Sequence, residues 1–212
     1  MGALNRRLSA VLGSILLAVS GCGSAAHRVP APPGAVTVVV VGDSITSMDS
    51  PDFDAGEIGP GSWADYADGH GVAILGGWAH PGATTTDMLD ALANRTLAAD
   101  VLVILAGNND IDHNVSVPVI ESRLERIAGM VHARRVVLST VAPEDAVAAA
   151  VEELNAQLPA LAGARGWQLV DPMSTISDGH GRYRPGMTRD GVHPTSPAAR
   201  VIGSVLHSAL VV

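Results

Sequence analysis

Short apolar runs alternate along this chain with longer segments in which apolar residues recur every three or four positions. The first run, Val-Thr-Val-Val-Val-Val at residues 36–41, is β-branched throughout, which is typical of a strand buried on both faces. Shorter runs predict four further strands, at residues 72–75, 101–105, 136–138 and 168–170. The segments around them predict helices at residues 62–70, 84–96, 119–132, 143–162 and 197–210.

Strands that alternate with helices indicate one parallel sheet with helices on both of its faces. We therefore expect a five-stranded α/β domain over residues 36–212. The chain length of 212 residues fits one such domain preceded by a leader. The sequence shows no internal repeat, no low-complexity segment and no second domain.

The beginning of the chain has the features of an export signal. Arg6 and Arg7 precede an apolar stretch of roughly a dozen residues, which is the length of a signal-peptide core, whereas a spanning helix needs about 20. The stretch ends in Val-Ser-Gly-Cys at residues 19–22, which resembles a bacterial lipoprotein lipobox. We expect residues 1–21 to be a lipoprotein signal peptide and Cys22 to carry the lipid. An ordinary cleaved signal peptide or an uncleaved anchor is the alternative.

The lipobox sets an expected location for the mature protein. Lipidated Cys22 would anchor it, exported and extracytoplasmic, to the bacterial cell membrane. Residues 22–35 would then form a tether, which is stiff because residues 25–34 contain three prolines. Cys22 is also the only cysteine of the chain, so no intrachain disulfide can form.

The charge of the chain limits its partners. The formal net charge is −8, and the 13 basic residues are all arginine. We find no basic patch that would neutralise a polyphosphate backbone, so we expect no nucleic-acid partner.

Polar residues suited to acyl-transfer chemistry follow the first run and precede the last helix. Ser44 ends Gly-Asp-Ser directly after the first predicted strand, where open α/β sheets place their ligands. By itself, this serine equally fits the N-cap of a helix. His193 is a candidate base, and Asp190, three residues earlier, is close enough to orient its imidazole. Asp171, after the fifth strand, competes for that role, but the shorter loop favours Asp190.

Ester hydrolysis also requires donors that stabilise an oxyanion. The candidates are the backbone N–H of Ser44, the backbone N–H of Gly82 and the side-chain amide of Asn109. Gly82 follows the second predicted strand, and Gly76 or Gly77 could replace it. Asn109 follows the third strand, in Gly-Asn-Asn-Asp at residues 107–110. Because the carboxyl ends of parallel strands share one edge, these groups can converge.

These pieces, in this chain order, resemble the SGNH, or GDSL-type, hydrolase family. They are Val-Gly-Asp-Ser-Ile-Thr around Ser44, Pro-Gly at residues 81–82, Gly-Asn-Asn-Asp around Asn109, and Asp-Gly-Val-His-Pro around His193. The resemblance spans residues 36 to about 210. It implies a flavodoxin-like, three-layer α/β/α sandwich and a serine esterase, lipase or carbohydrate deacetylase that uses no metal and no cofactor.

We therefore expect a serine ester hydrolase that forms an acyl-enzyme with a Ser44–His193–Asp190 triad. Its expected substrates are short-acyl esters or acetylated glycans of the cell envelope. The first alternative is a lipid-anchored binding protein that keeps the fold without catalysis. A flavodoxin-like nucleotide or FMN binder is a weaker alternative, because the first turn has no Gly-rich or Ser/Thr-rich phosphate cradle.

Overall fold

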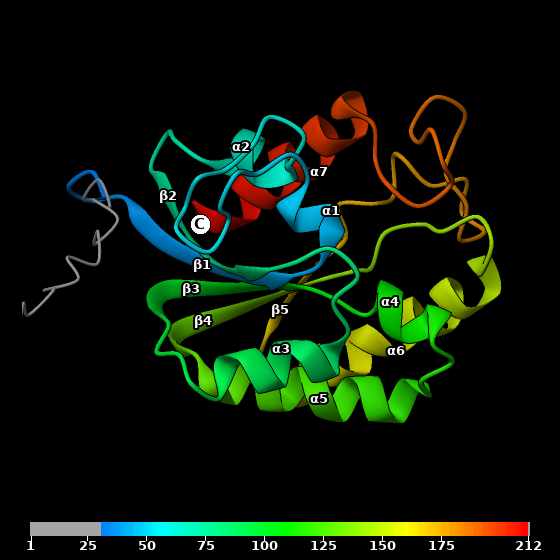
Figure 1. Cartoon of the computed structure of the whole chain (residues 1–212), viewed down its shortest axis with the longest axis horizontal. Helices are drawn as coiled ribbons and strands as arrows, with labels where there is room; N and C mark the ends of the chain where they lie inside the picture. The colour runs from blue at the N-terminus through cyan, green and yellow to red at the C-terminus, as the bar shows by residue number, and fades with distance from the viewer. Residues whose placement is uncertain (1–30, 212) are drawn as a thin grey trace, which may run out of the picture.

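The structure, a computed structural model, describes residues 31–211 and contains a sheet with helices on both faces (Figure 1). Its five strands are all parallel and follow the order β2-β1-β3-β4-β5. Their bounds are β1 (Val36–Gly42), β2 (Val72–Ala79), β3 (Ala98–Leu105), β4 (His132–Ser139) and β5 (Gln168–Val170). This is the order of flavodoxin-like doubly wound sheets, so the predicted fold class is confirmed.

The longer helices form the two outer layers (Figure 1). One layer contains α3 (Thr85–Leu92), α5 (Val117–Met130) and α6 (Ala148–Arg165); the other contains α2 (Trp63–Ala67) and α7 (Ser196–Leu210). Two short helices, α1 (Ser44–Ser47) and α4 (Asn108–Asp112), directly follow β1 and β3. The loops that follow β1 and β3 are therefore supported by helices on both faces of the sheet.

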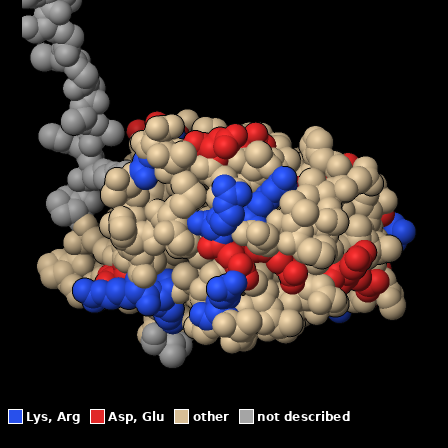
Figure 2. Space-filling model, turned by 90° about the horizontal axis from the view of Figure 1, so that it is seen from below, with Lys and Arg blue, Asp and Glu red and all other residues tan. Residues whose placement is uncertain are grey.

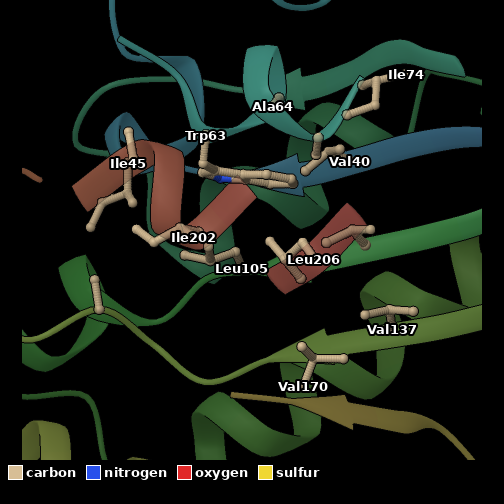
Figure 3. Packing of buried hydrophobic residues seen from close by; sticks show 14 of the residues in the cluster. Val40, Ile45, Trp63, Ala64, Ile74, Leu105, Val137, Val170, Ile202 and Leu206 are labelled. Atoms are coloured by element: carbon tan, nitrogen blue, oxygen red, sulfur yellow. The ribbon is translucent and has the colours of Figure 1, made fainter. Parts of the chain in front are cut away.

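Alternate residues of β1 fill two separate cores. Val40 packs with Trp63 of α2 on one face, as Figure 3 shows, whereas Val39 and Val41 pack with Leu124 of α5 on the other. Because both faces are covered, every position of the strand favours an apolar, β-branched residue. The buried sheet gives the loops at its carboxyl edge a rigid base.

The second strand differs from the prediction. It continues beyond residue 75 to Ala79, so Gly76 and Gly77 lie within the sheet and not in a turn. The pairing of β1 with β2 shifts register between Val38 and Val40, where Gly77 has φ +146°. A Cβ at Gly77 would collide with the backbone carbonyl of Val40, so only glycine fits this irregularity. Neither glycine reaches the loop after β2, which excludes both as alternatives to Gly82.

The helix predicted at residues 143–162 begins later, at Ala148. Residues before it are held in a loop, because the N–H of Glu144 donates to the Gly181 carbonyl and that of Asp145 to the Gly191 carbonyl. These bonds fasten the loop to the segment that precedes α7. The helix predicted at residues 84–96 ends at Leu92, and α4 was not predicted.

The predicted signal peptide and Cys22 lie outside the described residues, as does most of the predicted tether. Residues 31–35 include a turn in which the Ala35 N–H donates to the Pro32 carbonyl. Between residues 31 and 211, no helix is both long enough and apolar enough to cross a membrane.

Basic and acidic side chains alternate on the face that carries α3 and α5. Figure 2, which views the molecule from below Figure 1, shows separate blue groups of arginine with red carboxylates between them. The described residues on this face therefore form no continuous basic surface.

Candidate active site

The carboxyl ends of β1, β2 and β3 lie at one edge of the sheet. The last residue of β1, Gly42, pairs with Ala79 of β2 and with Leu105 of β3. The loops that follow these strands therefore start side by side. These three loops carry Ser44, Gly82 and Asn109, as the sequence predicts.

A continuous line of hydrogen bonds joins the three residues predicted to form a triad. The Oγ of Ser44 lies 3.0 Å from Nε2 of His193, and Nδ1 of His193 lies 2.8 Å from Oδ2 of Asp190. With the ring proton on Nδ1, the imidazole donates to Asp190, and Nε2 can accept the Ser44 hydroxyl proton. The structure thus brings together a serine, a base and an acid that are 149 residues apart at their extremes.

The Asp190 carboxyl is held in its ionised form. Burial raises its pKa, but the backbone N–H and the ring of His193, together with the Val192 N–H, lower it well below its usual range. The two backbone N–H groups donate to Oδ1 at 2.8 and 3.0 Å. Oδ2 is left to accept from the imidazole, and the negative charge stabilises an imidazolium when one forms.

Two further hydroxyls hold the turn that carries His193. Thr188 donates to the His193 carbonyl at 2.7 Å and accepts from the Gly191 N–H at 3.0 Å. The buried Tyr183 donates its hydroxyl to the Val192 carbonyl at 3.0 Å. This turn is therefore tied down at Gly191, Val192 and His193, which fixes the position of the imidazole.

Asp171, the competing acid, lies elsewhere. Its Oδ1 accepts the Thr140 hydroxyl at 2.8 Å and the Met173 N–H at 3.0 Å. Within residues 31–211, no hydrogen bond or ion pair joins it to His193. The geometry therefore favours Asp190 as the orienting acid.

The loops with the two remaining oxyanion candidates contact each other. Nδ2 of Asn109 donates to the Ala83 carbonyl at 3.0 Å, directly after Gly82. The amino group has a second proton, for which the described residues supply no hydrogen bond. Gly82 has φ +74°, a left-handed conformation that suits glycine and turns its peptide groups differently from a strand.

A cavity of about 750 Å³ opens beside Ser44 and His193. Its walls come from the loop after α1, from His80 and Pro81 after β2, and from the turn before α7. They mix apolar groups, such as Phe53, with the carboxylates of Asp49 and Asp52. A cavity of this size is in the range of small-molecule sites.

The sequence also matches a protein family over most of its length. A model of the GDSL-like Lipase/Acylhydrolase family matches residues 40–201, a range that contains all the candidate residues above. The chain belongs to this family. It is accordingly an enzyme of the carboxylic-ester hydrolase class. Among curated proteins, none matches the sequence significantly.

Solved structures of a lipolytic protein, a lipase/acylhydrolase and a carbohydrate acetylesterase share the fold. A member of the lipolytic protein G-D-S-L family from Veillonella parvula has a TM-score of 0.66 and 18% identity, over 82% of this chain and 97% of its own. The lipase/acylhydrolase from Enterococcus faecalis has a TM-score of 0.63 and 21% identity, over 82% and 94%. Est24, a carbohydrate acetylesterase from Sinorhizobium meliloti, has a TM-score of 0.62 and 18% identity, over 82% and 97%. At such identities the likeness establishes the fold alone.

The wall of the cavity contains a contact between Asp54 and His80 that the sequence did not predict. Oδ2 of Asp54 lies 3.1 Å from Nε2 of His80 and 2.8 Å from a guanidinium nitrogen of Arg95. The His80 ring also stacks on Trp78, with 4.6 Å between ring centroids. These contacts fasten the loop after α1, which carries Asp54, to the segment before Gly82. Only the proximity of His80 to Gly82 hinted at this in the sequence, because Asp54 is 26 residues away.

Asp110 and His113, two side chains of types that can bind metal ions, lie close together after β3 but have other contacts. Asp110 accepts from Thr85 and Arg123, and Nδ1 of His113 lies 2.7 Å from the Asn109 carbonyl oxygen. Across residues 31–211, no group of three or more His, Cys, Asp or Glu is arranged to hold a metal ion.

Two buried carboxyls lie near the triad of this GDSL-family site. Asp43 caps α1, since its Oδ1 accepts the Ile45 N–H at 3.0 Å. Its burial raises its pKa to about 7. Burial likewise raises the pKa of Glu144 to about 7, against a hydrogen bond from Asn108, and nearby Asp112 adds to the rise. Below pH 7, both carboxyls are therefore mainly in their neutral, protonated form.

We expect the free energy of unfolding to fall as the pH rises from about 4 to about 7. In this range Asp43 and Glu144 keep their protons in the folded protein, whereas the unfolded chain releases them. Together the two groups give this slope its sign, because the folded protein holds more protons than the unfolded chain. Urea unfolding across this range measures the slope. Asp43→Asn should make it shallower, and an unchanged slope would contradict a raised pKa at Asp43.

Proposed function

We propose that this protein hydrolyses esters through an acyl-enzyme on Ser44. The observation that carries the proposal is the 3.0 Å distance between the Ser44 Oγ and Nε2 of His193. In the first step, His193 takes the hydroxyl proton while Oγ bonds to the ester carbonyl carbon. The tetrahedral intermediate then collapses, the bond to the alkoxy oxygen breaks, and His193 returns the proton to the leaving alcohol.

Deacylation repeats these steps with water as the nucleophile. His193 takes a proton from the water, whose oxygen bonds to the acyl carbon, and then protonates Oγ as the acid product leaves. Asp190 keeps the imidazole oriented and stabilises its cationic form in both halves of the reaction. The N–H groups of Ser44 and Gly82 and the amide of Asn109 would stabilise each oxyanion.

We propose short-acyl esters or acetylated envelope glycans as substrates. Among the described residues, the large apolar side chains that stand out as exposed are Val119 and Val211, whereas a lipase benefits from a wide apolar surface. The open, partly polar cavity suits a hydrophilic alcohol such as a sugar. The carboxylates of Asp49 and Asp52 in its wall would disfavour a strongly anionic substrate.

A fluorophosphonate probe separates this proposal from a binding protein that only keeps the fold. The Ser44 oxygen should displace the fluoride at phosphorus, and peptide mass spectrometry should find one adduct, on the Ser44 peptide. His193→Ala should slow the labelling strongly, because Oγ then has no base. Native protein without an adduct, or with the adduct on another serine, would refute the proposal.

We also propose that the enzyme is exported and held at the cell membrane by lipidated Cys22. The lipobox at residues 19–22 supports this. The Cys22→Ala variant has no thiol to carry the lipid, so it should leave the membrane fraction or persist as an unprocessed precursor. Stable anchoring requires several acyl chains, which the variant lacks. Fractionation and intact-mass measurement test this, with Ser20→Ala as a control that keeps a small residue. Unchanged membrane partition with normal processing would exclude lipidation at Cys22.

A further inference from the structure

The Asp110 carboxylate joins the two loops that carry the proposed oxyanion donors Gly82 and Asn109. Asp110 is fully buried on α4, directly after Asn109. Its Oδ2 accepts the backbone N–H of Thr85 at 2.8 Å, and its Oδ1 accepts the Thr85 hydroxyl at 2.6 Å. Thr85 begins α3, three residues after Gly82, and is itself fully buried.

A third bond between the same loops lies closer to Gly82. Nδ2 of Asn109 donates to the Ala83 carbonyl at 3.0 Å. The adjacent residues Asn109 and Asp110 thus bind the segment that follows Gly82 at two points, Ala83 and Thr85. Two contact points restrict both the distance between the loops and their relative rotation. A single contact point would restrict only the distance.

We propose that Asp110 is a positioning residue that holds the Gly82 N–H and the Asn109 amide in register as one oxyanion hole. The inference rests on the proposed function, because it concerns the same hole. An oxyanion hole stabilises the transition state only if its donors are already in place before charge develops. Donors on separate loops would otherwise drift apart, and the charge-assisted bonds of a buried carboxylate are strong enough to prevent this.

The charge of Asp110 is compensated. Nη1 of Arg123, on α5, lies 3.1 Å from its Oδ1. A negative charge this close to a developing oxyanion would oppose catalysis, and the guanidinium offsets it. The carboxylate can therefore act as a strong acceptor beside the hole without adding a net negative charge there.

Stabilising the start of α3 does not require Asp110. The helix has its own capping box, in which Asp87 Oδ2 accepts the backbone N–H of Thr84 at 2.8 Å and its hydroxyl at 2.6 Å. Asp87 thus accepts hydrogen bonds from the backbone N–H and the hydroxyl of Thr84, just as Asp110 accepts them from the same two groups of Thr85. The contact of Asp87, however, stays within the first turn of α3 and its N-cap. It offers a matched control at the same helix end.

The test compares Thr85→Val, Asp110→Asn and the control Asp87→Asn in the full-length enzyme. Thr85→Val keeps the size and branching of threonine but removes the hydroxyl bond to Asp110. It should lower kcat about tenfold, and Asp110→Asn about 10²-fold, each with little change in KM, because misplacement weakens only transition-state contacts. Asp87→Asn should lower Tm but leave kcat near the wild-type value. Thr85→Ser should rescue most of the activity lost in Thr85→Val.

A double-mutant cycle then connects Asp110 to the hole. Asn109→Ala alone should lower kcat by about 10²–10³. If Asp110 acts through the hole, Asp110→Asn should lower kcat much less in the Asn109→Ala background than in the wild type.

Two results would overturn the inference while the wild type still turns over through Ser44. One is wild-type kcat in a folded Thr85→Val variant that merely melts earlier. The other is full additivity of Asp110→Asn and Asn109→Ala. A wild-type enzyme without Ser44-dependent turnover would instead refute the proposed function, and the inference with it.

Discussion

Ser44→Ala is expected to lower kcat for a short-acyl ester by on the order of 10⁶, since loss of a triad nucleophile typically has this effect. Alanine has no oxygen to form the acyl-enzyme, and His193 then has no hydroxyl to deprotonate. The fold should persist, because Asp43 and not Ser44 caps α1 through the Ile45 N–H. Steady-state turnover of p-nitrophenyl acetate, with the melting temperature alongside, measures both effects.

Ser47→Ala is the matched control for this variant. Ser47 lies in the same short helix, and among the described residues its buried hydroxyl has no hydrogen-bond partner. Its loss should therefore leave turnover near the wild-type level. If Ser44→Ala kept more than about a tenth of wild-type activity, the acyl-enzyme mechanism would be wrong, since water and the remaining groups do not reach that rate.

Most residues of the candidate site stand in short motifs or directly after a strand, and this explains why they could be predicted. Asp190 and His193 are separated by one tight turn, so their contact depends on few backbone angles. Ser44, Gly82 and Asn109 each follow a strand, and a parallel sheet places the carboxyl ends of neighbouring strands together. The prediction needed only a parallel sheet, which the alternation of apolar runs and helices indicates; the order β2-β1-β3-β4-β5 comes from the structure.

The contacts that support the site could not be predicted in this way. Asp54 reaches His80 and Asp110 reaches Thr85 across 26 and 25 residues, along loop paths that no local pattern encodes. From sequence, Asp110 fitted a residue that bonds the backbone of its own loop better than a metal ligand, and nothing pointed to Thr85 as its partner. Its buried partners distinguish these possibilities, and they become visible only once α3 and α4 are placed side by side.

The error at β2 has a tertiary cause. Gly76 and Gly77 follow a short apolar run and precede Pro81, which locally resembles the start of a turn. In the folded chain, the backbone of Val40 approaches Gly77 so closely that a side chain is excluded. The glycines therefore allow strand pairing to continue through an irregularity, and the turn begins only after Ala79.

Asp190→Asn is expected to lower kcat by about 10³–10⁴ with little change in KM, because it fixes the wrong imidazole tautomer. Oδ1 of the asparagine can still accept the N–H groups of Val192 and His193, so the turn should keep its shape. The amide nitrogen would then face Nδ1 and donate to it. The ring proton moves to Nε2, which can no longer accept the Ser44 proton.

Asp171→Asn tests the competing assignment in the same assay. Its carboxylate binds Thr140 and Met173, so its replacement should affect stability more than kcat. A large loss of kcat in Asp171→Asn, with Asp190→Asn near wild type, would transfer the orienting role to Asp171. Because both variants exchange a carboxylate for an amide of equal size, a difference in kcat between them reports which acid acts on His193.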